Sequence, residues 1–276
     1  MSKSGKPDLS ETPIFRVKVE TGVFFTRKDI IMHNLKFINI KRDVIENPEL
    51  TSEETATYMA LVATAINGKA YVTRNNLEMI MTGEIIPNIN LNGQILSLAT
   101  KLDTSSKPYI KILSNDKNSY IIDMSAAEVD TSKDYFAGIQ LCEIQKIFQN
   151  CKNNKYNVLR VLFEIVASFS HSTIMGKAKD RVGFCSLESI SEKTNLGVAT
   201  ISRCINILVD LQLIHRFTYS PRRRSDGSLK QDCNSYSRWE DRGYNISYCK
   251  KRIAGIQEKL KDDPMYEDKL DLWNDR

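Results

Sequence analysis

The amino-acid sequence predicts an α+β protein, mainly helical, in which one order of helices followed by a β-hairpin occurs twice and a further helix comes last. Apolar residues recur at helical spacing in several segments, and alternating apolar residues flank turn sequences. Residues 184–239 contain two short helices joined at Asn195, Leu196 and Gly197, followed by strand-like residues around a polar loop. This order is typical of a winged helix-turn-helix. We therefore expect two tandem winged helix-turn-helix domains plus a C-terminal helix.

Length and composition agree with a two-domain protein of ordinary type. The chain has 276 residues, of which 41% are hydrophobic and 26% charged, and a domain typically has roughly 100–200 residues. The start is polar without a signal-like apolar segment, and no apolar run approaches the roughly 18 residues of a membrane span. We expect a cytoplasmic protein without membrane contact, with an N-terminal winged-helix-like domain over 1–135, a DNA-binding winged-helix domain over 136–240 and a charged helical tail over 241–276.

The first copy begins with a clear helix start. Thr51 or Ser52 can cap a helix whose first turn holds Glu53 and Glu54, and a left-handed cap at Asn67 and Gly68 is expected to end it. The turn at 114–118 lies between alternating apolar residues, which is typical of a β-hairpin. Between them we expect a short strand over 70–72 and helices over 75–81 and 92–102.

The second copy follows a polar linker over 125–134. We expect an amphipathic helix over 137–150, a helix over 157–169, a strand over 182–185, a helix opening at Ser186 and a second helix over 199–211. Strand-like residues then lie at 213–219 and 234–239. The charged helix after Trp239 has Ile246, Ile253, Ile256 and Leu260 as its apolar stripe, and it can pack back on the second domain or bind a partner.

The second helix of the helix-turn-helix is the candidate recognition helix, which enters the major groove in this class of motif. Its expected core positions, with those of the helix before it, are Ile190, Leu196, Ile201, Ile205, Leu208 and Leu211. The expected outward positions are Thr200, Ser202, Arg203 and Asn206. Arginine can bind guanine in a bidentate manner, asparagine can bind adenine, and hydroxyl groups reach phosphates or base edges. The alternative is that these are only surface residues of a structural domain.

The polar loop after the first strand of this hairpin is strongly basic. Arg222, Arg223 and Arg224 precede a Ser-Asp-Gly turn, and Arg216 and Lys230 flank them. Residues 152–230 hold 13 Lys or Arg and six Asp or Glu, a net charge of +7, whereas the whole chain carries +5. Phosphate neutralisation needs such cations. We expect the cluster at the turn tip to contact the DNA backbone, and Lys177, Lys179 and Arg181 can join the same face; the alternative is a flexible solubilising loop.

The matching helix of the first copy is polar and hardly basic. It offers Asn92, Gln94, Ser97 and Lys101. This surface can contact DNA weakly or serve as a protein interface.

The sequence predicts no enzyme, no cofactor and no metal site. The histidines at 33, 171 and 215 are far apart, and neither a G-x-x-x-x-G-K-[ST] phosphate loop nor a G-x-G-x-x-G motif occurs. The six cysteines lack the close pairs typical of zinc ligands, so we expect reduced, partly buried thiols.

The segment SLESISEKTNLGVATISRCINILVDLQLI, the basic wing ending at Asn234, Ser235 and Tyr236, and the first unit resemble tandem winged-helix replication initiators of plasmids and phages. The resemblance spans most of 20–240 and is specific over 184–239. It implies binding of double-stranded DNA at repeated origin sites, recruitment of host replication proteins, and a homodimer or an oligomer assembled on DNA, often through the first unit.

Two other functions remain open from the sequence. One is a winged-helix transcriptional regulator or repressor with an N-terminal dimerisation or sensing domain, which a small-molecule cavity would favour. The other is a protein-interaction scaffold with structural winged helices, which a buried or neutralised arginine loop would favour.

Overall fold

The computed structural model has an α+β fold built mainly of helices with small antiparallel sheets. It describes residues 37–73, 77, 91–103, 108–116, 119–131, 133–169, 181–219, 222–223, 229–230, 233–260 and 274–275. The expected helix over 75–81 therefore lies outside the described residues, apart from Leu77.

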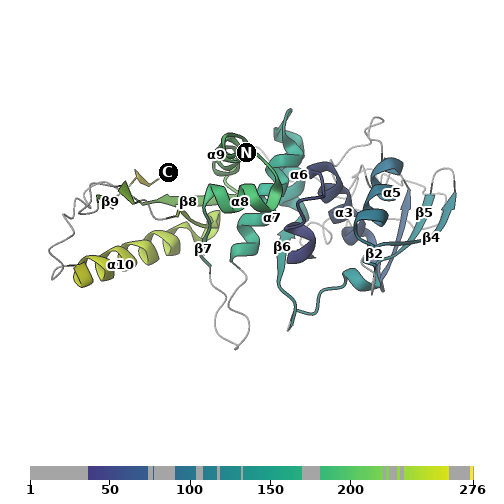
Figure 1. The fold of residues 1–276 in the computed structure, drawn as a ribbon, viewed down its shortest axis with the longest axis horizontal. Helices are drawn as coiled ribbons and strands as arrows, with labels where there is room; N and C mark the ends of the chain where they lie inside the picture. The colour runs from purple at the N-terminus through teal and green to yellow at the C-terminus, as the bar shows by residue number, and fades with distance from the viewer. Residues whose placement is uncertain are drawn as a thin grey trace, which may run out of the picture.

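The first half of the described chain forms a helix pair against a four-stranded sheet of order β2-β3-β5-β4. Its elements are β1 (Phe37–Lys41), α2 (Arg42–Ile45), α3 (Ser52–Thr64), β2 (Ala65–Ile66), β3 (Lys69–Thr73), α5 (Leu91–Lys101), β4 (Lys111–Asp116), β5 (Ser119–Asp123) and the 3-10 helix η1 (Ser125–Ala127). Figure 1 shows these elements at one end of the molecule.

The second half forms a helix cluster and a sheet of order β12-β8-β11-β7. Its elements are β6 (Phe136–Gln140), α6 (Leu141–Asn150), α7 (Lys155–Ser168), β7 (Gly183–Phe184), α8 (Leu187–Thr194), α9 (Val198–Asp210), β8 (Ile214–Thr218), β9 (Arg222–Arg223), β10 (Leu229–Lys230), β11 (Ser235–Arg238), the 3-10 helix η3 (Trp239–Asp241), α10 (Arg242–Leu260) and β12 (Asn274–Asp275). Figure 1 shows α6 and α7 between the two ends of the molecule.

The helix predicted after Thr51 forms, but it ends earlier than expected. Thr51 and Glu54 make a capping box, in which each side chain accepts from the other residue's backbone N–H. The helix stops at Thr64, and Asn67 (φ 51°) and Gly68 (φ 72°) form the two-residue turn between β2 and β3. Two successive positive φ angles are what a tight hairpin of this type needs, so the Asn-Gly pair marks a hairpin turn and the predicted helix cap is wrong.

The amphipathic helix predicted over 137–150 is in fact a strand followed by a helix. Residues Phe136–Gln140 form β6, which pairs with β1 and places Ile139 opposite Ile38. Both side chains are buried, at 0% and 2% exposure. The local periodicity could not show this because the partner strand lies far away in the sequence.

The two halves share one hydrophobic core. Helix α7 packs against α3, α9 and β6, and the main cluster of buried apolar residues includes side chains from both sides of residue 135. The predicted polar linker over 125–134 contributes Ala126 and Ala127 to the buried residues. The predicted boundary at 135/136 thus falls between η1 and β6, where the chain passes from one half to the other.

Buried charges reinforce this junction. Arg160 of α7 is 1% exposed and donates to the backbone oxygens of Leu50 and Asn47, with 2.7 Å from Nη2 to the second. Lys193 of α8 lies 2.7 Å from a carboxylate oxygen of Glu46 and 3.8 Å from one of Glu164. These contacts connect α7 and α8 to the loop before α3.

None of the helices in the described part of the chain is both long enough and apolar enough to cross a membrane.

Candidate nucleic-acid interface

The predicted break between α8 and α9 is fixed by local capping. Ser186 caps α8 by accepting from the N–H of Ser189 at 3.1 Å, and Asn195 ends the helix in the left-handed conformation with φ 55°. Ser191 Oγ then donates to the backbone oxygen of Leu196 at 2.7 Å, and α9 begins after Gly197. These bonds set the angle between α8 and α9.

One face of α9 is buried as expected. Ile190 on α8 and Ile201, Ile205 and Leu208 on α9 are at most 1% exposed. The other two expected core residues, Leu196 and Leu211, are partly buried against the same cluster. The opposite face of α9 is consequently the one that reaches solvent.

That outer face carries the predicted base-contacting residues. Arg203 and Asn206 are exposed, and Thr200 and Ser202 are half-buried. At 3.6 residues per turn, Ser202, Arg203 and Asn206 lie within about 100° of one another around the helix, with Thr200 at the margin of this group. The structure therefore brings three of the four predicted residues onto one face. Arg203 Nε donates to the backbone oxygen of Ala199 at 3.2 Å, which holds its guanidinium toward the start of α9.

The predicted flanking cation Arg216 has a different environment. It lies on β8 directly opposite Tyr236 of β11, and its side chain is half-buried. Tyr236 belongs to the main core, so Arg216 shares the sheet face turned toward the helices. Its Nε is buried and has no hydrogen-bond partner among the described residues.

The basic loop includes a short antiparallel ribbon. Arg222 of β9 pairs with Lys230 of β10, and Arg223 pairs with Leu229. Arg222 and Arg223 thus lie in a strand, where a turn tip was expected, and Arg224 lies outside the described residues, as do Lys177 and Lys179.

Arg181 is placed elsewhere. It forms an ion pair with Asp241 at 3.3 Å, and its Cζ lies 5.8 Å from the ring centre of Tyr244 on α10. The expectation that it joins the basic loop is replaced by a position beside α10.

The polar residues of α5, which matches α9 in the first half, form bonds within the protein. Gln94 accepts from Thr57 at 2.5 Å, Ser97 donates to Glu54 at 2.5 Å, and Lys101 pairs with Glu54 at 2.8 Å. These bonds join α5 to α3. Three of the four side chains that could have met DNA are therefore committed to packing. Their partners Thr57 and Glu54 lie far away in the sequence, so no local pattern shows these bonds.

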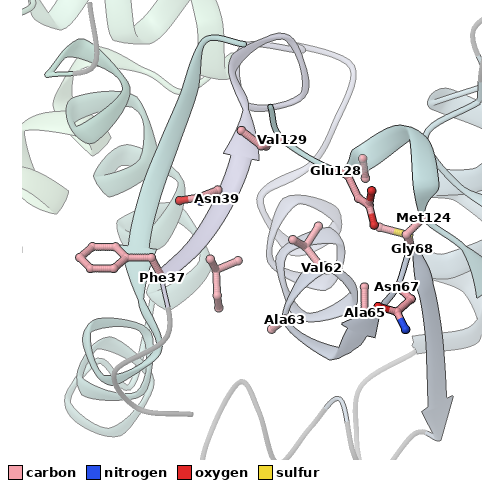
Figure 2. A pocket seen from close by; sticks show the side chains of 12 residues that line it. Phe37, Asn39, Val62, Ala63, Ala65, Asn67, Gly68, Met124, Glu128 and Val129 are labelled. Atoms are coloured by element: carbon pink, nitrogen blue, oxygen red, sulfur yellow. The ribbon is translucent and has the colours of Figure 1, made fainter. Parts of the chain in front are cut away.

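A cavity of about 170 Å³ lies between β1, α3 and the segment after β5. Figure 2 shows Val62, Ala63, Met124 and Glu128 among its lining residues. The sequence gives no sign of this cavity, because its lining comes from three segments without any common motif.

The described residues include all six cysteines and one of the three histidines, His215. They contain no group of three His, Cys, Asp or Glu side chains that could hold a metal ion. His215 is buried and bonded to Asn245, and all six cysteines are free thiols.

The chain matches no protein-family model and no curated protein sequence.

Proposed function

We propose that the chain binds double-stranded DNA sequence-specifically through a winged helix-turn-helix formed by the elements from α7 to β11. In this proposal α9 is the recognition helix and the ribbon of β9 and β10 is the wing. The order helix, strand, helix, helix, then a hairpin supports it, as does the net charge of +7 over residues 152–230.

One observation carries the proposal more than any other. Arg203 and Asn206 are exposed on the same face of α9, whose opposite face is buried in the core. These are side chains that can bind guanine and adenine in the major groove. Arg222 and Lys230, side by side in the ribbon, add positive charge in the same unit.

The biological role that we propose is initiation of plasmid or phage replication at repeated origin sites. The elements from α3 to β5 run helix, strands, helix and hairpin, which is part of the order of the second half, and they are proposed as the first winged unit. Since Gln94, Ser97 and Lys101 are engaged with α3, this unit is proposed to organise copies of the protein rather than to recognise bases. The proposal assigns the chain no catalytic step, cofactor or metal.

Self-association and host replication proteins are part of the same proposal. The first half exposes Ile66, Tyr71 and Leu113 on its sheet, at 68%, 57% and 47% of their surfaces. Exposed apolar side chains on three strands of one sheet suit a homodimer or an oligomer assembled on DNA.

A transcriptional regulator is the second candidate, and the cavity in the first half is the observation that favours it. Its volume of about 170 Å³ is well below the roughly 300–1,000 Å³ of typical small-molecule sites. The cavity therefore supports an effector site only weakly, and we place the initiator first.

Footprinting of the full-length protein on the DNA that flanks its gene tests the proposal. We expect several adjacent protected copies of one sequence, filled cooperatively. A single protected site beside a promoter would favour the regulator. Uniform affinity for that DNA and for random duplex would contradict sequence-specific binding.

A further inference from the structure

A row of aromatic rings and arginine side chains runs along α10 and the adjoining end of β7. The rings of Tyr244 and Tyr248 are stacked, with centres 6.3 Å apart and planes 30° apart, and Phe184 lies 6.0 Å from Tyr248. Arg181 lies at one end, with Cζ 5.8 Å from the Tyr244 ring, and Arg252 at the other, with Cζ 4.5 Å from the Phe184 ring. Five side chains, from α10, from β7 and from Arg181 just before β7, thus form one continuous ladder.

The two tyrosines are not needed to dock α10. The face of α10 that meets the sheet consists of Asn245, Cys249 and Ile253, of which the first two are fully buried. Tyr244 and Tyr248 are 48% and 41% exposed. Large rings exposed side by side are available to a ligand.

The surroundings of the ladder favour an anionic ligand. The cations Arg242, Lys251 and Arg252 are exposed on α10, and Arg242 lies over Trp239 with Cζ 5.4 Å from the ring. Asp241 is half-buried and paired with Arg181. A polyanion with flat rings matches this combination of charge and aromatic surface.

The ladder lies on the far side of the sheet from α9. Alternate residues of a strand point to opposite faces. Phe217 of β8 and Tyr219 just after it pack with Cys249 of α10, whereas Ile214 packs in the main core with α9. Figure 1 likewise shows α10 on the side of β8 away from α9. A ligand on α10 therefore leaves α9 free.

We propose that Tyr244 and Tyr248 form a stacking surface for the unpaired bases of a single-stranded nucleic acid, whose phosphates bind Arg181, Arg242 and Arg252. Single-strand binders combine cations along the backbone with aromatic rings that stack on the bases, and stacking tolerates any sequence. A duplex hides its base faces within the helical stack, so its bases cannot lie on these rings. Binding at α10 does not depend on duplex recognition at α9.

Fluorescence anisotropy with the full-length protein and a labelled oligothymidylate of about 12 nucleotides, a length within known single-strand site sizes, tests this surface. Each of Tyr244→Ala and Tyr248→Ala is expected to weaken binding by about 5-fold or more, since one base–aromatic stack contributes at least that factor. Tyr244→Phe and Tyr248→Phe keep the ring and should keep the affinity.

Control variants separate the loss of this stacking surface from the loss of any exposed tyrosine, of duplex binding or of stability. Tyr135→Ala removes a tyrosine before β6 that is as exposed as Tyr244, at 48%, and should leave oligothymidylate binding unchanged. Arg203→Ala should weaken duplex binding alone, so the failure of one site is distinguishable from the failure of the other. A thermal melt of each variant should stay near that of the wild type because these rings are exposed.

The same measurement with a labelled oligouridylate distinguishes RNA from DNA as the single strand that binds. Tighter binding of the uridylate assigns the surface to RNA, and tighter binding of the thymidylate assigns it to DNA. The proposal is overturned if the wild type binds neither strand, if Tyr135→Ala weakens binding as much as Tyr244→Ala, or if Tyr244→Ala weakens only capture of a protein partner.

Discussion

At the residue scale, sequence recognition is predicted to rest on Arg203 and Asn206. Changing either to Ala should cost roughly 1–3 kcal/mol on the footprinted site, because the side chain can no longer form a bidentate pair with a base, and little on random duplex. Fluorescence anisotropy with both DNAs measures the difference. Lys152→Ala removes an exposed cation after α6 and is the matched control. Equal losses of affinity for both DNAs would assign Arg203 and Asn206 to phosphates.

Burial of Glu164 links stability to pH. Desolvation raises the pKa of this carboxyl group to about 7 from an ordinary 4.5. The folded protein therefore holds the proton more tightly than the unfolded chain does. The resulting stabilisation is complete below pH 4.5 and is lost as the pH rises through about 7, by up to about 3 kcal/mol.

Urea unfolding of wild type and Glu164→Gln across this pH window tests that link. The variant cannot ionise at this position, so its free energy of unfolding should fall less between pH 5 and pH 8. Parallel pH profiles for the two proteins would show that Glu164 titrates normally.

At the element scale, the wing is predicted to supply charge without sequence preference. The triple change of Arg222, Arg223 and Arg224 to Ala should weaken binding to all duplexes alike. The slope of log affinity against log salt should also become shallower by about 0.9 for each phosphate that the wing no longer neutralises. An unchanged slope measured by salt titration would remove the wing from the interface.

The docking of α10 is predicted to depend on a buried polar network. Asn245 accepts from Ser235 Oγ at 2.9 Å and lies 3.1 Å from Nδ1 of His215, and Cys249 Sγ lies 3.2 Å from Tyr219 Oη. Asn245→Ala leaves buried polar groups on β8 and β11 without this partner, which should cost about 1–3 kcal/mol of stability. Urea unfolding measures it, with the exposed neighbour Tyr244→Ala as control. A destabilisation no larger than the control's would show that the network does not hold α10.

This network also shows where sequence patterns stop being informative. The periodicity of apolar residues correctly predicted the buried face of α9, because Ile201, Ile205 and Leu208 recur at helical spacing. The same approach chose Ile246 for the inner face of α10, whereas the structure buries Asn245 and Cys249. A polar residue becomes a core residue only when distant partners such as His215 and Ser235 satisfy it, and those partners are invisible to a local pattern.

At the scale of the whole molecule, the two halves behave as one packed body around α7. Local signals predicted α3, α5, the β4–β5 hairpin, α7, α8 and α9, but not β6 or the turn between β2 and β3. They missed the pairing of β1 with β6 and the buried Arg160, since both depend on contacts between segments far apart in the sequence. For the candidate site, they placed Arg203 and Asn206 on the outer face of α9 and misplaced Arg181.

Initiation of replication through recognition of duplex DNA by α9 can be measured directly. The protein is supplied in trans to a plasmid that cannot replicate alone and that carries the DNA flanking its gene. We predict autonomous replication of that plasmid, abolished by Arg203→Ala and retained with Lys152→Ala. Absence of replication, together with repression of a reporter joined to the same DNA, would contradict the initiator and leave the regulator.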